Sequence, residues 1–265
     1  MSDHAITLSS LAGEAIILGS GASAGTPVIG CPCAVCHSPD PRNRRTRAST
    51  VVKIAGQTLL IDTSPDLRLQ ALREGIHHLD AVLYTHPHAD HLNGIDDLRA
   101  YCFHSRAAIP VFGNRFTIDN ILERFGYACL PPGKYWDKPV LTPQAVDNPF
   151  QFQGLTITPI PLIHGPWEIF GWRIGNFAYL TDLNQLAESS LALLQGLDVL
   201  FLDCLREEPY PSHLGFGQAL ELAAVIGARQ TVLIHMTHQM EYQDMLDRCP
   251  SGVVPGYDGL RLAFA

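Results

Sequence analysis

The feature that most constrains this chain is the run His-Pro-His-Ala-Asp-His at residues 86–91. It follows the apolar segment 81–84 directly, and that segment has the length and composition of a buried strand. With 12 histidines in 265 residues, a chance match to this pattern is on the order of one in a thousand. Imidazole and carboxylate ligands suit zinc, manganese and iron, so the run predicts a metal site at a strand end.

Further ligands are expected from the second half of the chain, again where apolar segments end. His164 ends Pro-Leu-Ile-His, Asp182 ends Tyr-Leu-Thr-Asp and His235 ends Val-Leu-Ile-His. With the candidates of the first run, these residues provide enough ligands for two ions: His86, His88, Asp90, His91, His164, Asp182 and His235. Asp182 has a competing interpretation as a helix N-cap, because a helix is predicted from residue 184 onward.

The secondary-structure pattern predicts an α/β fold. Short apolar segments indicate strands at 15–18, 50–54, 58–62, 81–85, 155–160, 172–174, 177–181, 199–202 and 231–234. Helical spacing of apolar residues indicates helices at 65–74, 94–103, 184–194 and 216–226. Strands followed by helices in both halves predict an αββα sandwich. We expect a single domain over residues 1–265, with a zinc-knuckle loop at about 30–48.

A second metal site is indicated by a cysteine cluster. Cys31, Cys33 and Cys36 have C-x-C-x₂-C spacing and lie among seven cysteines in all. Three thiolates are one ligand short of a closed structural zinc site. His238 is the candidate for the fourth position, and His37 is its nearby rival. The alternative is a loop of unliganded thiols.

Several other residues are candidates for contacts with a substrate. Arg44, Arg45 and Arg47 belong to an arginine-rich segment at 42–47 that would match the geometry of a phosphate, although a solvated basic loop explains it equally well. Backbone amides of the glycine loop, at Gly21, Ser23 and Gly25, are weaker candidates for the same role. Three tryptophans could cover the cleft, or could belong to the core or a dimer interface: Trp136, Trp167 and Trp172.

These motifs resemble the metallo-β-lactamase superfamily. From Gly19 to about His238 the chain is similar, more narrowly, to the phosphoribosyl cyclic phosphate phosphodiesterases of phosphonate degradation. The resemblance implies that His86, His88 and His164 bind one ion, that Asp90, His91 and His235 bind another, and that Asp182 bridges them. It also implies supporting roles for the following residues: Asp62 beneath the metal loop, Cys31, Cys33, Cys36 and His238 around a structural Zn²⁺, and His213 as general acid or substrate clamp.

Composition narrows the classes of function. A net charge of −8 disfavours a sequence-independent nucleic-acid binder, which usually carries a basic surface. No stretch reaches the roughly 20 apolar residues of a membrane span, and the first residues lack a basic-then-apolar pattern, so we expect a soluble cytoplasmic protein without a membrane partner. The resemblance adds the expectation of a homodimer.

The predicted function is hydrolysis of a small cyclic phosphodiester, such as 5-phosphoribosyl 1,2-cyclic phosphate. His213, Asp90 and Asp182 are the expected catalytic residues, with two Mn²⁺ or Zn²⁺ ions as cofactors. The alternatives are a tRNA 3′-end endonuclease, a thioester hydrolase, a quinone-cofactor biosynthesis protein and a scaffold with an inactive site. β-Lactam hydrolysis is disfavoured.

Overall fold

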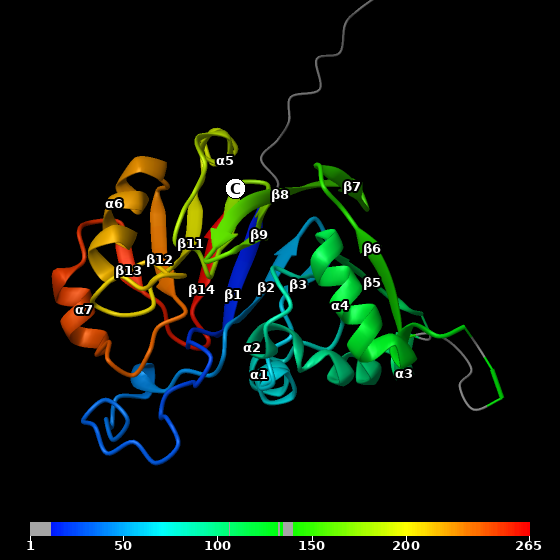
Figure 1. Ribbon diagram of the computed structural model, residues 1–265, viewed down its shortest axis with the longest axis horizontal. Coiled ribbons are helices and arrows are strands. Elements are labelled where there is room, and N and C mark those ends of the chain that lie inside the picture. The colour runs from blue at the N-terminus through cyan, green and yellow to red at the C-terminus, as the bar shows by residue number, and fades with distance from the viewer. Residues whose placement is uncertain (1–11, 106, 132, 135–139) are drawn as a thin grey trace, which may run out of the picture.

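The computed structural model describes residues 12–105, 107–131, 133–134 and 140–265. Its strands form two seven-stranded sheets, seen in the centre of Figure 1. The first sheet, in spatial order, contains β14 (Arg261–Phe264), β1 (Gly13–Gly19), β2 (Ser49–Ile54), β3 (Gln57–Ile61), β4 (Ala81–Leu83), β5 (Ile109–Gly113) and β6 (Leu141–Ala145). The second contains β13 (Val253–Pro255), β12 (Gln230–Ile234), β11 (Val199–Asp203), β10 (Phe177–Leu180), β9 (Trp167–Ile174), β8 (Leu155–His164) and β7 (Phe150–Phe152).

Helices cover the outer faces of both sheets, as Figure 1 shows. In chain order the α-helices are α1 (Leu67–Glu74), α2 (Ala89–Leu92), α3 (Arg99–Ser105), α4 (Arg115–Phe125), α5 (Glu188–Ala192), α6 (Phe216–Ile226) and α7 (Tyr242–Arg248). Short 3₁₀ helices occur as η1 (Pro41–Asn43), η2 (Ile95–Leu98) and η3 (Gly126–Cys129). The helices α1 to α4 lie on the first sheet and α5 to α7 on the second.

The core follows from the alternation of side chains along each strand. In β1, Ala15 and Ile17 point into the layer between the sheets, whereas Ile16 and Leu18 point toward the helices of the first sheet. A third cluster of apolar side chains lies between the second sheet and its helices. Both faces of each sheet are therefore buried, and the predicted αββα sandwich is confirmed.

The predicted helix at 184–194 is too long. The backbone N–H of Asn184 donates to the carbonyl of Ile163 at 2.9 Å, and that of Ile163 donates to the carbonyl of Gln185 at 3.1 Å. These bonds pair residues 184–185 with β8, and the helix α5 covers only Glu188–Ala192. Because the N-cap of α5 is Ala187, the competing interpretation of Asp182 as a cap is wrong.

The strands gather the candidate ligands at one end of the sandwich. Parallel pairing places Leu180 beside Leu202 and Leu202 beside Leu233, so the residues that follow these strands are neighbours. The same holds for Asp62 and the metal run, because β3 and β4 are parallel as well. Three residues just after these strands have left-handed backbones, at Asp62 (φ 60°), Asp182 (φ 56°) and His235 (φ 60°). Such backbones are uncommon outside glycine and concentrate at functional sites.

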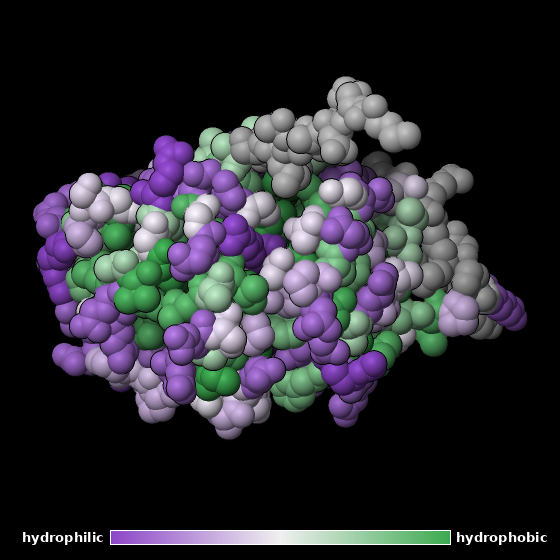
Figure 2. Space-filling view, turned by 90° about the horizontal axis from the view of Figure 1, so that it is seen from above, coloured by the Kyte–Doolittle hydropathy of each residue, from purple (hydrophilic) through white to green (hydrophobic). Residues whose placement is uncertain are grey.

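The long loop between β1 and β2 leaves the sandwich near α7, where it is drawn in blue in Figure 1. Asn43 of this loop donates to the carboxylate of Glu241 at 2.6 Å, and Arg42 lies over the ring of Tyr242 at 4.1 Å. The face shown in Figure 2 mixes hydrophilic and hydrophobic residues. Among the described residues, we find no helix with the length and apolarity that a bilayer crossing requires.

Candidate metal centre

The metal run leaves β4 and turns directly into α2, so its side chains face the end of the sandwich. Asp62 lies beneath the run and is fully buried. Its carboxylate accepts hydrogen bonds from the backbone N–H of Thr85 at 2.8 Å and from the Thr85 hydroxyl at 2.7 Å, and it lies 2.8 Å from Nδ1 of His91. Asp62 thus orients the loop and one imidazole, which is the supporting position expected of it.

A first group of ligand atoms comes from His86, His88, His164 and Asp182. Nε2 of His86 lies 2.9 Å from Nδ1 of His88, which lies 3.3 Å from Nε2 of His164. One carboxylate oxygen of Asp182, Oδ2, lies 3.7 Å from His86 and 3.9 Å from His164. These atoms converge on a common point from β4, β8 and β10.

A second group adjoins the first and comes from Asp90, His91 and His235. The carboxylate of Asp90 lies 3.3 Å from Nε2 of His91 and 3.4 Å from Nε2 of His235. The other oxygen of Asp182, Oδ1, lies 3.3 Å from both of these imidazoles. Asp182 therefore directs one oxygen at each group, as a bridging ligand does.

The residues fit divalent ions. Nε2 of His91 is buried with no hydrogen-bond partner among the described residues, although two carboxylates lie 3.3 Å away. Ligands bound tetrahedrally at about 2.0–2.1 Å from zinc stand about 3.3 Å apart. The spacing of the second group therefore matches a set of ligands around one ion, and the donor types suit zinc, manganese or iron.

The charges of the two groups also favour cations. Burial and the neighbouring His91 hold the pKa of His86 well below its usual range, so its imidazole is neutral and able to act as a ligand. Burial opposes ionisation of Asp182, yet His235 and His91 hold its pKa well below the ordinary value. Burial also opposes a charge on His91, but Asp182, Asp90 and Asp62 together raise its pKa. Three carboxylates around one imidazole leave an excess of negative charge for cations to neutralise.

His213 lies at the edge of these groups, in the loop that leads into α6. Its Nε2 is 3.9 Å from the carboxylate of Asp182, and its ring is 4.8 Å from that of His164. The side chain is largely buried. The structure thus places the predicted general acid beside both groups of ligands.

Asp203 is a candidate site residue that the sequence did not single out. It ends β11, is fully buried, and holds its Oδ1 3.3 Å from Nδ1 of His213 and 3.5 Å from Nδ1 of His235. The backbone N–H groups of Asp182 and Leu214 donate to it at 3.2 and 3.0 Å. Burial lowers the pKa of His213, but the bond and charge of Asp203 outweigh burial and raise it. An apolar strand ending in aspartate, as at Asp62 and Asp182, was the available signal.

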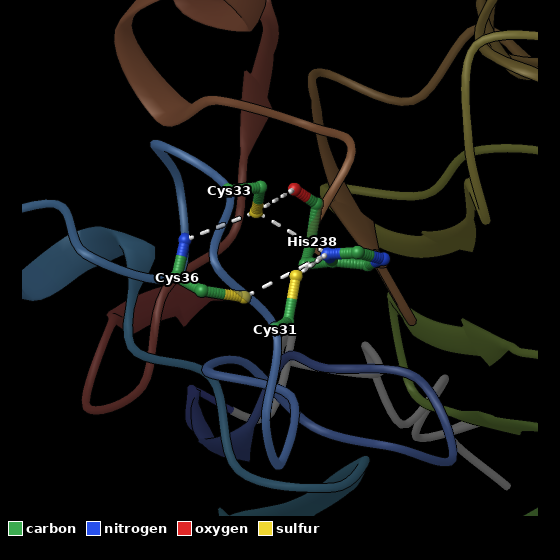
Figure 3. A group of neighbouring side chains, drawn as sticks. All are labelled: Cys31, Cys33, Cys36 and His238. Carbon is green, nitrogen blue, oxygen red and sulfur yellow. Dashed lines mark hydrogen bonds between the residues drawn. The ribbon is translucent and has the colours of Figure 1, made fainter.

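The four residues predicted to hold a structural zinc lie together, as Figure 3 shows. Nδ1 of His238 lies 3.3, 3.4 and 3.6 Å from the sulfur atoms of Cys31, Cys33 and Cys36. For bonds of about 2.3 Å to sulfur and 2.0–2.1 Å to nitrogen, tetrahedral zinc separates these ligands by about 3.6 Å. His37, the rival fourth ligand, is exposed and places its Nδ1 3.1 Å from the carbonyl of Cys33 instead.

The arginine-rich segment does not form the expected phosphate site as a unit. Arg45 is buried, and its guanidinium donates to the carbonyls of Thr237 at 3.1 Å and Met240 at 2.7 Å, so the predicted substrate contact is wrong for this residue. Arg47 forms a two-pronged ion pair with Asp66, at 2.6 and 2.8 Å. Arg44 is exposed.

Of the tryptophans, Trp167 alone is placed beside the ligands among the described residues. Its ring lies 4.6 Å from that of His88 and 5.3 Å from that of Phe116. Trp172 is fully buried in the core between the sheets. Trp136 lies outside the described residues.

Comparison with known proteins agrees with this architecture. Residues 57–236 match the family model described as the beta-lactamase superfamily domain. The chain therefore belongs to the metallo-β-lactamase superfamily. It is similar, with 39% identity and a TM-score of 0.89, to the crystal structure of a diphosphatase from the PhnP family, and the similarity covers 96% of this chain and 97% of that one. Within the superfamily, this likeness makes the chain a PhnP-type protein.

Two further relatives bear on the function. The chain is 41% identical to an octanoyltransferase of Porphyromonas gingivalis over 250 aligned residues. This alignment covers 92% of this chain and 50% of the octanoyltransferase. The chain thus spans half the length of this relative. Coenzyme PQQ synthesis protein B of Methylobacterium nodulans is 38% identical over 100 residues, about a third of each chain.

Proposed function

We propose that this hydrolase cleaves a small phosphodiester, with a cyclic phosphate such as 5-phosphoribosyl 1,2-cyclic phosphate as the leading substrate. The observation that carries the proposal is the carboxylate of Asp182, which directs one oxygen at each of two adjoining ligand groups. Two divalent ions held there would supply positive charge and a hydroxide nucleophile at neutral pH. The Cys31, Cys33, Cys36 and His238 group would hold a further zinc with a structural role.

The protein's own residues account for the rest of the reaction. Asp203 fixes the ring of His213 through Nδ1, which leaves Nε2 facing the ligand groups. A proton on Nε2 is then available to the leaving oxygen of the ester. Because Asp203 favours the charged imidazole, His213 suits the role of general acid.

A diphosphate bond is the second candidate, because the PhnP-family neighbour at 39% identity is described as a diphosphatase. Both reactions place a tetrahedral phosphoryl group beside the same ligands and require the same acid. Acyl transfer is not proposed. The P. gingivalis octanoyltransferase is twice the length of the region matched here. Quinone-cofactor biosynthesis has weaker support, because the PQQ synthesis protein B relatives match either a third of the chain at 38% identity or 93% of it at only 24% identity.

The test compares substrates on one preparation. Protein loaded with zinc or manganese is assayed against bis(p-nitrophenyl) phosphate, a ribose cyclic phosphate, a nucleoside diphosphate and a glutathione thioester, with Asp182→Ala as the inactive control. Turnover of either phosphodiester, lost in the control together with both catalytic ions, supports the proposal. Turnover of the diphosphate alone selects the second candidate, and turnover of the thioester alone overturns both.

A further inference from the structure

A cleft of about 370 Å³ opens beside the metal centre. Three segments line it: the turn after β1, the loop between β11 and α6, and the loop after β12. His213 and His235 belong to its wall, so a molecule bound in the cleft also reaches the ligand groups. The other side chains used below, Ser23, Arg206 and Tyr210, line the same space.

Arg206 is the arginine of this wall, and it forms no ion pair with a carboxylate among the described residues. Its Nε donates to the carbonyl of Glu208 at 3.2 Å and one terminal nitrogen to that of Pro209 at 3.3 Å. The guanidinium lies 4.7 Å from the ring centroid of Tyr210, which supports it from one side. The positive charge of Arg206 is therefore held in place, but no carboxylate of the described residues neutralises it. Arg47 differs, because its guanidinium forms an ion pair with Asp66.

The loop that carries Arg206 also carries His213. The backbone N–H of Leu205 donates to the carbonyl of Leu214 at 3.1 Å, and that of Phe216 donates to the carbonyl of Arg206 at 2.9 Å. These two bonds close the loop on itself. The backbone at Arg206 is thereby joined to the segment that carries His213.

Residues 22–25, which also line the cleft, form a tight turn. The N–H of Gly25 donates to the carbonyl of Ala22 at 2.8 Å. At Ser23 and Ala24, the exposed central positions, we find no acceptor for the backbone N–H within the part of the chain that the structure describes. Adjacent free N–H groups in such turns bind anions.

The turn is held firmly at both ends. The N–H of Ala22 donates to the carbonyl of Met236 at 3.1 Å, and that of Thr26 donates to the carbonyl of Arg45 at 2.8 Å. Arg45 in turn binds the carbonyl of Thr237. The buried arginine thus supports this wall of the cleft without contacting a substrate.

We propose that Arg206 and the amides of Ser23 and Ala24 form an anion site that binds a second, non-reacting phosphate of the substrate. This inference rests on the proposed function and assigns to named residues the recognition of the terminal phosphate that the leading substrate carries. Guanidinium and turn amides are suited to a phosphate dianion. The reacting phosphate lies at the metal centre and the second phosphate in the cleft.

The test compares two substrates that differ only in this group. The variants Arg206→Ala, Arg206→Lys and Ser23→Pro are assayed with 5-phosphoribosyl 1,2-cyclic phosphate and with ribose 1,2-cyclic phosphate. Proline fits position 23 because it is the first central residue of a turn without positive φ, and it removes one amide donor. For Arg206→Ala we expect KM for 5-phosphoribosyl 1,2-cyclic phosphate to rise by about 10- to 100-fold. This rise should be at least tenfold larger than the rise in KM for ribose 1,2-cyclic phosphate.

Binding gives a readout that does not depend on turnover. Calorimetry with ribose 5-phosphate on the metal-loaded protein is expected to show at least tenfold weaker binding in Arg206→Ala, an intermediate value in Arg206→Lys, and no change in Arg229→Ala, whose exposed side chain pairs with Asp198. Equal binding by wild type and Arg206→Ala, or equal losses for the two substrates, overturns the anion site. Arg206-dependent binding without turnover of any phosphodiester refutes the proposed function and leaves the anion site standing.

Discussion

The carboxylate of Asp203 lies 3.3 Å from Nδ1 of His213, on the side of the ring that faces away from the ligand groups. Aspartate in this position fixes the tautomer of the ring and stabilises its charged form. It also lies near His235 and binds the backbone of Asp182, so one buried carboxylate organises both the proposed acid and the metal loops.

The first prediction concerns Asp203→Asn. An amide removes the charge that raises the pKa of His213, so the imidazole loses its proton at lower pH. A general acid must be protonated, and the basic limb of the kcat/KM profile should therefore move to lower pH. We expect kcat to fall by about 10- to 100-fold at neutral pH. The measurement is a pH–rate profile together with metal content.

The control for this variant is Asp198→Asn, at the opposite end of β11. Asp198 pairs with the exposed Arg229, remote from the ligand groups. Its replacement should leave the profile unchanged. A uniform loss of rate in Asp203→Asn at every pH, with no shift of the limb, would mean that Asp203 serves the fold alone.

The second prediction concerns the cysteine group. Cys33→Ser removes one of three thiolates, so the protein should lose one zinc and its Tm should fall by roughly 5–10 °C, because metal binding contributes to folding. Cys129→Ser is the matched control, since Cys129 lies outside the group. Metal analysis and thermal unfolding test this. Loss of the catalytic ions alone, with the structural zinc retained, would contradict the division into two sites.

The third prediction is a pH dependence of thiol reactivity in metal-free protein. Hydrogen bonds from the backbone of Cys36 and from His238 lower the pKa of Cys33 to about 6, whereas burial raises that of Cys36. A thiol with a lowered pKa is thiolate above that pH, so at pH 7 Cys33 should react with iodoacetamide before Cys36. Mass spectrometry of digested protein identifies the labelled residue. Zinc should suppress the labelling, and preferential labelling of Cys36 would refute the assignment.

Much of the site follows from the sequence because its ligands end apolar strands. Residues 86–91 form a dense local pattern, and the strand ends of His164, Asp182 and His235 extend it. The anion site was not predictable in this way. In the sequence, Arg206 precedes two glutamates, a pattern typical of a solvated charged surface. Its place in the wall of the cleft depends on the hydrogen bond that joins this loop to Leu214, which is a tertiary contact.

For Arg45 the error was the opposite one, because the sequence predicted a substrate contact that the structure contradicts. Its position in a run of arginines suggested a phosphate contact. The side chain is instead buried, and it donates to backbone carbonyls that are nearly two hundred residues away in the sequence. Contacts at such separation depend on tertiary structure. The homodimer implied by the family resemblance also depends on contacts that the sequence does not show. It stays a prediction, to be tested by light scattering in solution.

The most direct test of the account is a zinc titration of metal-free protein, with hydrolysis of bis(p-nitrophenyl) phosphate measured after each equivalent. The cysteine and histidine group should take the first equivalent without activity, because thiolates bind zinc strongly. The rate should then rise through the second and third equivalents and stay constant beyond them, because the proposed reaction would use two ions, one at each group toward which Asp182 directs an oxygen. Full activity after a single equivalent, or hydrolysis by the metal-free protein, would contradict it.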